Sequence, residues 1–409
     1  MADDAVVNLR QKYVDDPRIA CQYGVKCYQK SQVHLQKYKH PPPKRPLQDR
    51  KQPPSKRLKK TLDDEEKPPP AASPARPKSP PILSKDKELS RPDLGRTDKD
   101  FNVKQFIKEK FLMEMPEDFY EFWELCKSLN AKHPEEALKE FGLALVGPYD
   151  VLADKFSDVP EQPQENYLLH WRFYHDPPEC QTVLKGDEKT GYHLGYFRDD
   201  PQKPPVFLVA NEANNNGQFT VMGDNIFASV NLYLEAFKKG FDPFKKMKLP
   251  QLQRGLKEKA QQLQLNLEAK PQQVRDRNRQ IVARTFNKIG MVVPYNKKTE
   301  VGYRELTLSN KELQKLLDNI QAALPDQRLS LLSELQGLLT NVTIATDECD
   351  FGAGIELGLN ILAHGVDCLN RTISQCLAIN YRLIQREEFA KIIESHMDNR
   401  RRGPDLSII

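Results

Sequence analysis

The sequence predicts an α+β protein with a small Cys/His-containing module, a disordered linker and a larger body. In the body, a helix-flanked and mainly antiparallel sheet domain packs on a mostly α-helical domain. Three observations lead to this prediction. Residues 41–100 hold 14 of the 31 prolines and no Phe, Trp or Tyr. Short strand-like runs separated by Asp, Gly, Asn and Pro clusters follow the first helical pattern of the body. Apolar residues at three-to-four spacing then dominate.

Composition separates the linker from the rest. The chain has 409 residues and a net charge of +5, and residues 41–100 alone carry 16 Lys/Arg against 10 Asp/Glu. The remainder therefore sums to −1. A segment without aromatic residues cannot bury enough apolar surface to offset its ordering entropy, so we expect it to be disordered. We divide the chain into 13–43, 44–100, 101–240 and 241–409. No apolar stretch approaches the ~20 residues of a membrane span, which predicts a soluble, intracellular protein.

Two basic clusters lie in the linker, Lys44-Arg45 and 56–60, about ten residues apart. Such a pair in a flexible chain is typical of a bipartite nuclear localisation signal. A solvated charge run that attracts DNA nonspecifically is the alternative, and both interpretations can hold.

In the body, apolar residues at helical spacing predict a helix around 119–126. Antiparallel strands follow from short runs without intervening helices. A helix capped by Asp224 closes this half, and Ser309 with Glu312 forms a capping-box signature ahead of another. The strands are expected at 141–146, 168–174, 181–184, 192–198, 206–210 and 218–222. Further helices are expected at 328–341, 353–363, 366–385 and 387–400.

The N-terminal module carries Cys21, Cys27, His34 and His40 in the spacing C-x5-C-x6-H-x5-H. Two thiolates and two imidazoles complete a tetrahedral zinc site, and zinc can fold so small a module outright. Chance clustering is the alternative. The other cysteines that occur singly in apolar surroundings, Cys126, Cys180, Cys368 and Cys376, are predicted to be buried thiols.

Spacing and intervening residues resemble the poly(ADP-ribose)-binding zinc finger. The resemblance implies that Arg18, Tyr23 and Tyr28 bind ADP-ribose, which suits stacking on adenine and a guanidinium fork for phosphate. The family usually has a basic residue where Gln29 stands, which predicts weaker binding. A finger that only folds or binds protein stays open.

Several short strings across the body occur in one order over about 300 residues. They are 116–120, 170–174, 176–179, 195–199, 223–225, 301–306, 347–350 and 354–358. Together they resemble the histone PARylation factor 1 family, accessory factors of DNA-damage-activated poly(ADP-ribose) polymerases. The finger lies outside this resemblance.

The resemblance implies a composite active site. Glu348 would enter the polymerase's site as the general base that a serine hydroxyl needs, while the polymerase binds NAD. Asp347 would anchor the docking loop, and Arg304 and Tyr303 would lie at the interface. The chain would be no enzyme by itself. Histones and the polymerase would be the substrates, and chromatin at DNA damage in the nucleus the location.

Alternatives stay open at this point. Asp347 or Asp350 could merely cap a helix. The protein could be a non-catalytic adaptor that reads poly(ADP-ribose), or a hydrolase that uses Asp347, Glu348 and Asp350 on a metal. His170 and His175 could suggest a metal pair, but His170 lies in an apolar run and a structural role is favoured. His193 and His364 are expected to lack partners.

Overall fold

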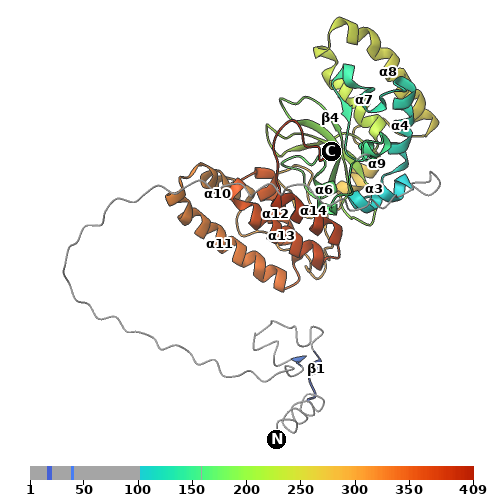
Figure 1. Ribbon diagram of the computed structural model, residues 1–409. Coiled ribbons are helices and arrows are strands. Elements are labelled where there is room, and N and C mark those ends of the chain that lie inside the picture. Colours follow the sequence, from blue (N-terminus) through green and yellow to red (C-terminus); the bar gives the residue numbers. More distant parts are fainter. Residues whose placement is uncertain (1–15, 21–37, 41–101, 158) are drawn as a thin grey trace, which may run out of the picture. The chain divides into compact units, whose positions relative to one another are not determined.

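The structure, a computed structural model, describes residues 16–20, 38–40, 102–157 and 159–409. These residues belong to two compact units, of which the second contains the whole body from residue 102 onward (Figure 1). The predicted linker lies outside the described residues, as do Cys21, Tyr23, Cys27, Tyr28 and His34.

The described N-terminal residues contain short strands. The body consists of helices and one sheet. Strands β1 to β7 are Ile19–Ala20, Tyr38–Lys39, Ala144–Leu145, Cys180–Lys185, Tyr192–Phe197, Phe207–Glu212 and Phe219–Val221. Helices α3 to α8 are Val103–Phe111, Glu117–Leu129, Pro148–Leu152, Gln164–Leu169, Ile226–Phe237 and Pro243–Gln262. Helices α9 to α14 are Gln272–Asn278, Asn310–Ala322, Pro325–Asp347, Phe351–His364, Asn370–Leu383 and Glu387–Asp398. Short 3₁₀ turns are Pro134–Glu136, Lys139–Phe141, Lys238–Gly240 and Asp367–Leu369.

The body sheet has the order β3-β4-β5-β6-β7, and every pairing in it is antiparallel. All six residues of β5 are buried because the strand lies in the middle of this sheet. Helices α4 and α7 belong to the same apolar core as the sheet; the rings of Phe122 and Phe227 meet edge-on at 5.4 Å. The predicted α+β character and antiparallel sheet are confirmed.

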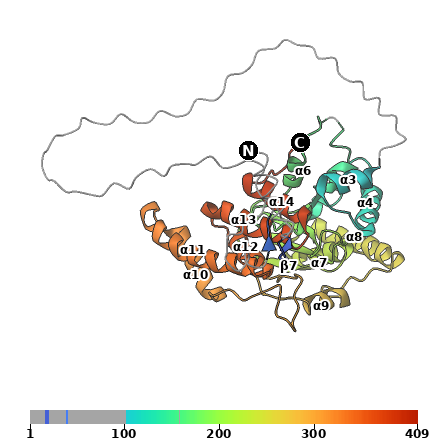
Figure 2. The ribbon, with the colours of Figure 1, turned by 90° about the horizontal axis from the view of Figure 1, so that it is seen from below.

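The C-terminal part of the body is helical, with α12 at its centre. Helix α12 packs between α11 and α13, and every residue from Gly352 to Ala363 is buried. Figures 1 and 2 both show α10 and α11 beside α12 and α13, away from α8. Among the described helices, none is long and apolar enough to cross a membrane.

The strand predicted at 168–174 is wrong. Helix α6 ends at Leu169, and Trp171 has a φ of 54°. Backbone groups of this buried run find partners other than a neighbouring strand. The amide of Trp171 donates to the carbonyl oxygen of Leu406 and that of Phe173 to Oδ2 of Asp176, while Arg172 donates to the carbonyl oxygen of Leu168. The apolar residues of 168–174 therefore indicate a buried segment and not an extended strand.

Two smaller expectations also need correction. The strand predicted at 141–146 is reduced to the two residues of β3, because Phe141 ends a 3₁₀ turn and Gly142 has a φ of 83°. Helix α7 is capped by Asn225, whose side chain accepts from the amide of Ala228, and not by Asp224.

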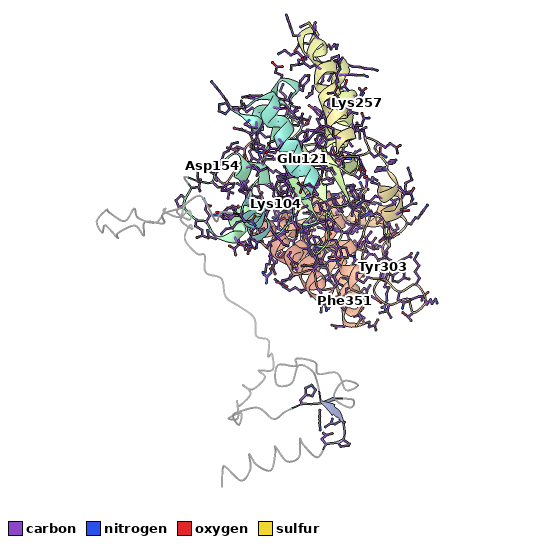
Figure 3. All side chains as sticks on the ribbon, turned by 90° about the vertical axis from the view of Figure 1, so that its right-hand side faces the viewer. Lys104, Glu121, Asp154, Lys257, Tyr303 and Phe351 are labelled. Carbon is purple, nitrogen blue, oxygen red and sulfur yellow. The ribbon has the colours of Figure 1, made fainter. Side chains whose placement is uncertain are left out.

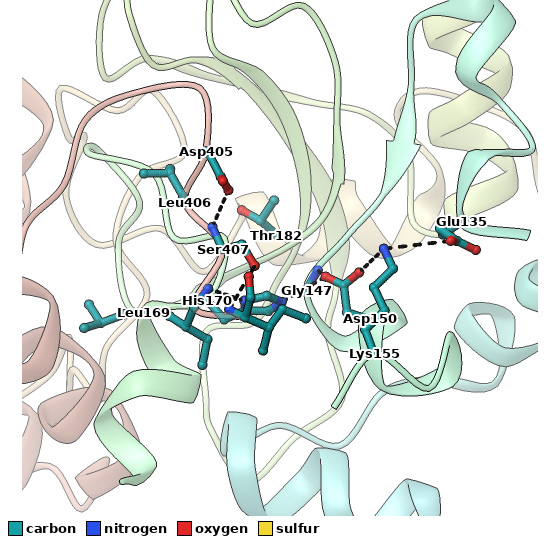
Figure 4. A network of polar contacts seen from close by, with 12 residues as sticks. Glu135, Gly147, Asp150, Lys155, Leu169, His170, Thr182, Asp405, Leu406 and Ser407 are labelled. Carbon is teal, nitrogen blue, oxygen red and sulfur yellow. Dashed lines mark hydrogen bonds and ion pairs between the residues drawn. The ribbon is translucent and has the colours of Figure 1, made fainter. Parts of the chain in front are cut away.

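The C-terminal tail returns to the sheet half through a buried polar network (Figure 4). The amide of Ile408 donates to Nδ1 of His170, whose Nε2 lies 2.9 Å from Oδ2 of Asp150. Nζ of Lys155 donates to Oδ1 of the same carboxylate at 2.8 Å. Burial alone would raise the pKa of Asp150, but His170 and Lys155 hold it below its usual range. His170 therefore has the structural role that was favoured.

The predicted capping box is present: the Ser309 hydroxyl accepts from the Glu312 amide, and the Glu312 carboxylate accepts from the Ser309 amide. We predict that Ser309→Ala lowers the free energy of unfolding by about 1 kcal/mol, because the amide of Glu312 in the first turn of α10 loses its side-chain acceptor. Urea unfolding measures this. Ser330→Ala, in the interior of α11, is the control; an equal effect of both substitutions would contradict the capping role.

Candidate functional site

The site lies at the turn that joins α11 to α12. Asp347 ends α11, Glu348 is its C-cap, and Asp350 directly precedes α12. The amide of Cys349 donates to the carbonyl oxygen of Thr346, and that of Asp350 to Ala345. These two bonds form a Schellman motif, which needs a left-handed residue at its centre. Cys349 takes that conformation with a φ of 73°, where glycine is usual.

This geometry corrects the expectation that the acidic loop opens a helix. Helix α11 extends to Asp347, six residues beyond its predicted end, so Glu348 sits at a helix C-terminus. Negative charge is unfavourable there, and a nearby cation relieves the cost. Asp350 occupies the capping position of α12, but its side chain makes no capping bond.

Three consecutive residues, 302–304, lie along this turn, and we call them the strap. The amide of Gly302 donates to Oδ1 of Asp350 at 3.0 Å, and its carbonyl accepts from the amide of Gly352 at 2.9 Å. The Tyr303 hydroxyl donates to Oε2 of Glu356 at 2.9 Å. Each strap residue is thus bonded to the α11–α12 segment.

Arg304 completes the strap with two ion pairs. Its Nη2 lies 2.5 Å from Oε2 of Glu348 and 3.0 Å from Oδ2 of Asp350. The bond to Glu348 raises the pKa of Arg304 above its usual range. The guanidinium therefore supplies the positive charge that this end of α11 needs. Glu348 remains accessible, with 54% of its side chain exposed, whereas the side chain of Asp350 is 7% exposed.

Beneath the strap lies Glu356, a buried residue of α12. Burial raises its pKa to about 7, with a smaller contribution from the Glu305 carboxylate, and the hydrogen bond from Tyr303 opposes the shift. Burial also raises the pKa of Tyr303 well above its usual range. The hydrogen bond between Tyr303 and Glu356 joins the strap to α12, and no sequence signal singled out Glu356.

The predicted interface residues thus meet at one place. Glu348, Arg304 and Tyr303 line one open hollow of about 660 Å³ together with Asp350. Asp347 is exposed at the end of α11. Asp350, predicted only as a helix cap or as a ligand in the hydrolase alternative, and Gly302, which was not singled out, fix the turn to the strap.

In the N-terminal unit, β1 pairs parallel to β2, with Ala20 opposite Lys39. Lys39 directly precedes the predicted ligand His40. Ala20 directly precedes the predicted ligand Cys21, which lies outside the described residues. Arg18 is exposed and forms a hydrogen-bonded ion pair with Asp16.

The predictions for the remaining histidines and cysteines are confirmed only in part. His193 is partnered after all: it stacks on Phe173 at 3.9 Å and lies 2.9 Å from Oδ1 of Asp176. His364 likewise lies 2.8 Å from Oδ1 of Asp318. Of the cysteines predicted to be buried, Cys126, Cys180 and Cys376 are, but Cys368 is exposed. Within 102–157 and 159–409, no three His, Cys, Asp or Glu residues gather as a metal site.

Comparison with known proteins identifies the family of the body. The family model described as histone PARylation factor 1 matches residues 102–400, which contain the strap and the turn. The chain belongs to the histone PARylation factor 1 family. A second family model, described as a PBZ domain, matches residues 18–43. The latter match covers all four predicted zinc ligands.

Relatives cover most of the chain. Histone PARylation factor 1 of Bos taurus is 38% identical over 78% of this chain and 93% of its own length. The protein of the same name from Danio rerio is 39% identical over 73% of this chain and 86% of its own. A putative histone PARylation factor 1-like protein of Homo sapiens is 34% identical over 79% of this chain and 93% of its own length.

The raised pKa of Glu356 predicts a pH-dependent stability. A carboxyl group whose pKa rises from 4.5 to about 7 on folding favours the protonated folded state, so stability falls as pH rises between these values. At pH 8 the cost is at most about 3 kcal/mol. Glu356→Gln keeps an acceptor for Tyr303 and removes this cost. We therefore expect its advantage over the unsubstituted chain to grow from pH 5 to pH 8.

Denaturant unfolding at a series of pH values measures this difference. Glu165→Gln, a change at an exposed carboxylate of α6, should leave the pH profile unaltered. A Glu356→Gln profile parallel to that of the unsubstituted chain would contradict the raised pKa.

Proposed function

We propose that the chain is an accessory factor of a poly(ADP-ribose) polymerase and that Glu348 completes the active site of that enzyme. The single observation that carries the proposal is the position of Glu348, half exposed on a turn that the strap holds rigidly. Membership of a family whose named relatives are histone PARylation factors supports the polymerase and histones as partners.

The proposed chemistry is the activation of serine. A serine hydroxyl is a weak nucleophile at neutral pH and needs a base within about 2.6–3.2 Å. With NAD held by the polymerase, the serine oxygen forms a bond to the anomeric carbon of the ribose as the bond to nicotinamide breaks. Glu348 takes the hydroxyl proton. A carboxylate on a flexible loop would lose much of this effect, whereas the Schellman motif and Arg304 orient this one.

The roles of the neighbouring residues follow from their positions. Arg304 would orient Glu348 and contact the partner. Tyr303, which is hydrogen-bonded to Glu356, would hold the neighbouring Arg304 in place. Asp347 is free to bond with the polymerase beside the base. The chain alone has half of an active site, so we propose that it is catalytically silent by itself.

The N-terminal module has a separate proposed role. Zinc, bound by Cys21, Cys27, His34 and His40, would fold the finger, and Arg18, Tyr23 and Tyr28 would bind ADP-ribose units. Arg18 can serve only if the ligand phosphate replaces Asp16. Polymer binding would raise the local concentration of the factor at damaged chromatin. The basic clusters of the linker would direct the protein into the nucleus.

Glu348→Gln tests the catalytic role. The substitution keeps the shape of the side chain and removes the base, so serine modification should fall at least about 100-fold. Affinity for the polymerase catalytic domain should stay within about threefold. The assay combines polymerase, NAD, broken DNA and histone, and acceptor residues are identified by mass spectrometry. Glu334→Gln, an exposed change on the same helix, is the control.

Three outcomes are informative. Retained serine modification by Glu348→Gln would reject the base and favour a non-catalytic adaptor. Loss of binding to the polymerase together with activity would assign Glu348 to docking alone. Turnover of an ADP-ribosylated substrate by the purified chain with Mg²⁺ would favour the hydrolase that uses Asp347, Glu348 and Asp350.

Deletion of residues 1–43 tests the finger. Recruitment to polymer-rich sites in cells should fall severalfold, because one of two attachment points is lost. Serine modification in the reconstituted reaction should persist, because the strap and turn remain. Equal recruitment of the full and shortened chains would contradict a polymer-binding finger.

A further inference from the structure

Charge is segregated within the body. Residues 238–257, which form the corner between α7 and α8 and much of α8, hold seven Lys/Arg and one Asp. The Glu348 turn instead is surrounded by Glu300, Glu305 and Asp350. Figure 3 shows Lys257 at one end of the body, with Tyr303 and Phe351 near the other. Outside the linker the charges of the chain sum to −1, so the net charge gives no sign that basic and acidic residues are separated.

Much of this positive charge is not neutralised within the body. Lys238 pairs with Glu235 and Lys248 with Glu140. Both ion pairs are exposed, and such pairs contribute little to stability. Nζ of Lys245 lies 3.8 Å from Oδ2 of Asp242, and Nζ of Lys246 donates to the carbonyl oxygen of Lys239. Lys239, Arg254 and Lys257 have no ion-pair partner among residues 102–157 and 159–409.

These charges form a strip along one helix. Lys246 and Lys257 are about 16 Å apart along the axis of α8, and Lys246, Arg254 and Lys257 lie within about 80° of one another around it. Leu249, Leu252 and Leu256 lie on a different face, on average about 120° around the helix from the strip, and pack into the core of the sheet half. The basic strip therefore has no role in packing.

Two apolar side chains stand beside the strip. Phe244 is 76% exposed and Met247 is 73% exposed, and their spacing of three places them on neighbouring positions of the helix surface. Large apolar side chains so exposed and so close together indicate contact with another molecule. Lysines that flank Phe or Met recur in proteins that bind DNA phosphates and insert an apolar wedge into the minor groove.

We propose that the α7–α8 corner binds the backbone of duplex DNA. Phosphates attract Lys239, Lys246, Arg254 and Lys257, and the strip is long enough to contact phosphates on both sides of a groove ~12 Å or less in width. Phosphates repel the acidic surroundings of the Glu348 turn. DNA therefore binds the α8 end and leaves the Glu348 end free. This inference is independent of any catalytic role of Glu348.

Two four-fold variants of the full chain test the proposal. Both remove four exposed positive charges and keep the basic linker, so only the position of the lost charge differs. The corner variant is K239Q/K246Q/R254Q/K257Q. The control variant, with substitutions on other elements, is K189Q/K311Q/K315Q/K391Q. Circular dichroism and thermal unfolding establish that both are folded.

Fluorescence anisotropy with a labelled 20-base-pair duplex, titrated at several salt concentrations, is the measurement. The corner variant should bind at least tenfold more weakly than the unsubstituted chain at 100 mM salt. Its slope of log affinity against log salt should be smaller by about 3, because up to four phosphate contacts are lost. The control should stay within twofold. F244A/M247A should weaken binding about threefold without changing the slope.

Poly(ADP-ribose), anionic vesicles and an acidic protein serve as competing probes. We expect the corner variant to lose more affinity for duplex DNA than for any of these probes. Equal weakening of DNA binding in both four-fold variants, or in neither, would overturn it. Loss of binding to another probe with DNA binding intact would also overturn it and assign the corner to that partner.

Discussion

The candidate site depends on the contact between the strap, residues 302–304, and the turn after α11. Asp350 is central, because one carboxylate oxygen accepts from the amide of Gly302 and the other pairs with Arg304. Arg304 in turn holds Glu348. A buried anion with a backbone donor and a guanidinium is satisfied, so it can fix two segments 48 residues apart in sequence. Without the Asp350 carboxylate, the strap would lose its bond from Gly302 to the turn, and Arg304 would lose one of its two anionic partners.

Close packing behind the turn reinforces this contact. A Cβ atom on Gly354 would lie 2.0 Å from Nδ2 of Asn380 on α13, and one on Gly352 would lie 2.9 Å from the carbonyl oxygen of Gly302. Both glycines therefore let α12 approach its neighbours. The left-handed Cys349 adds local strain at the same place, and strained residues persist where surrounding contacts over-determine them. A turn held in this way suits the role that we propose for Glu348, in which its carboxylate acts in a partner's active site.

Local signals in the sequence predicted much of the fold. The apolar spacing around Phe119, the alternation of short runs and the Ser309 capping box each have a nearby physical cause. The prediction at 168–174 failed because backbone groups of this run bond to Leu406, to Asp176 and to the side chain of Arg172, and not to a neighbouring strand. The end of α11 was missed because Cys349 stands where glycine would have marked the stop. Glu348 was singled out through family resemblance alone, and the basic corner was hidden because its charge is cancelled elsewhere in the body.

The central claim is that the strap and the turn form the face presented to the polymerase. Amide hydrogen exchange of the full chain, with and without the polymerase catalytic domain, tests it most directly. We predict increased protection at 301–305 and 345–353 in the complex, with α8 unchanged because it lies away from this face. Protection of α8 or the sheet with no change at these two segments would contradict it.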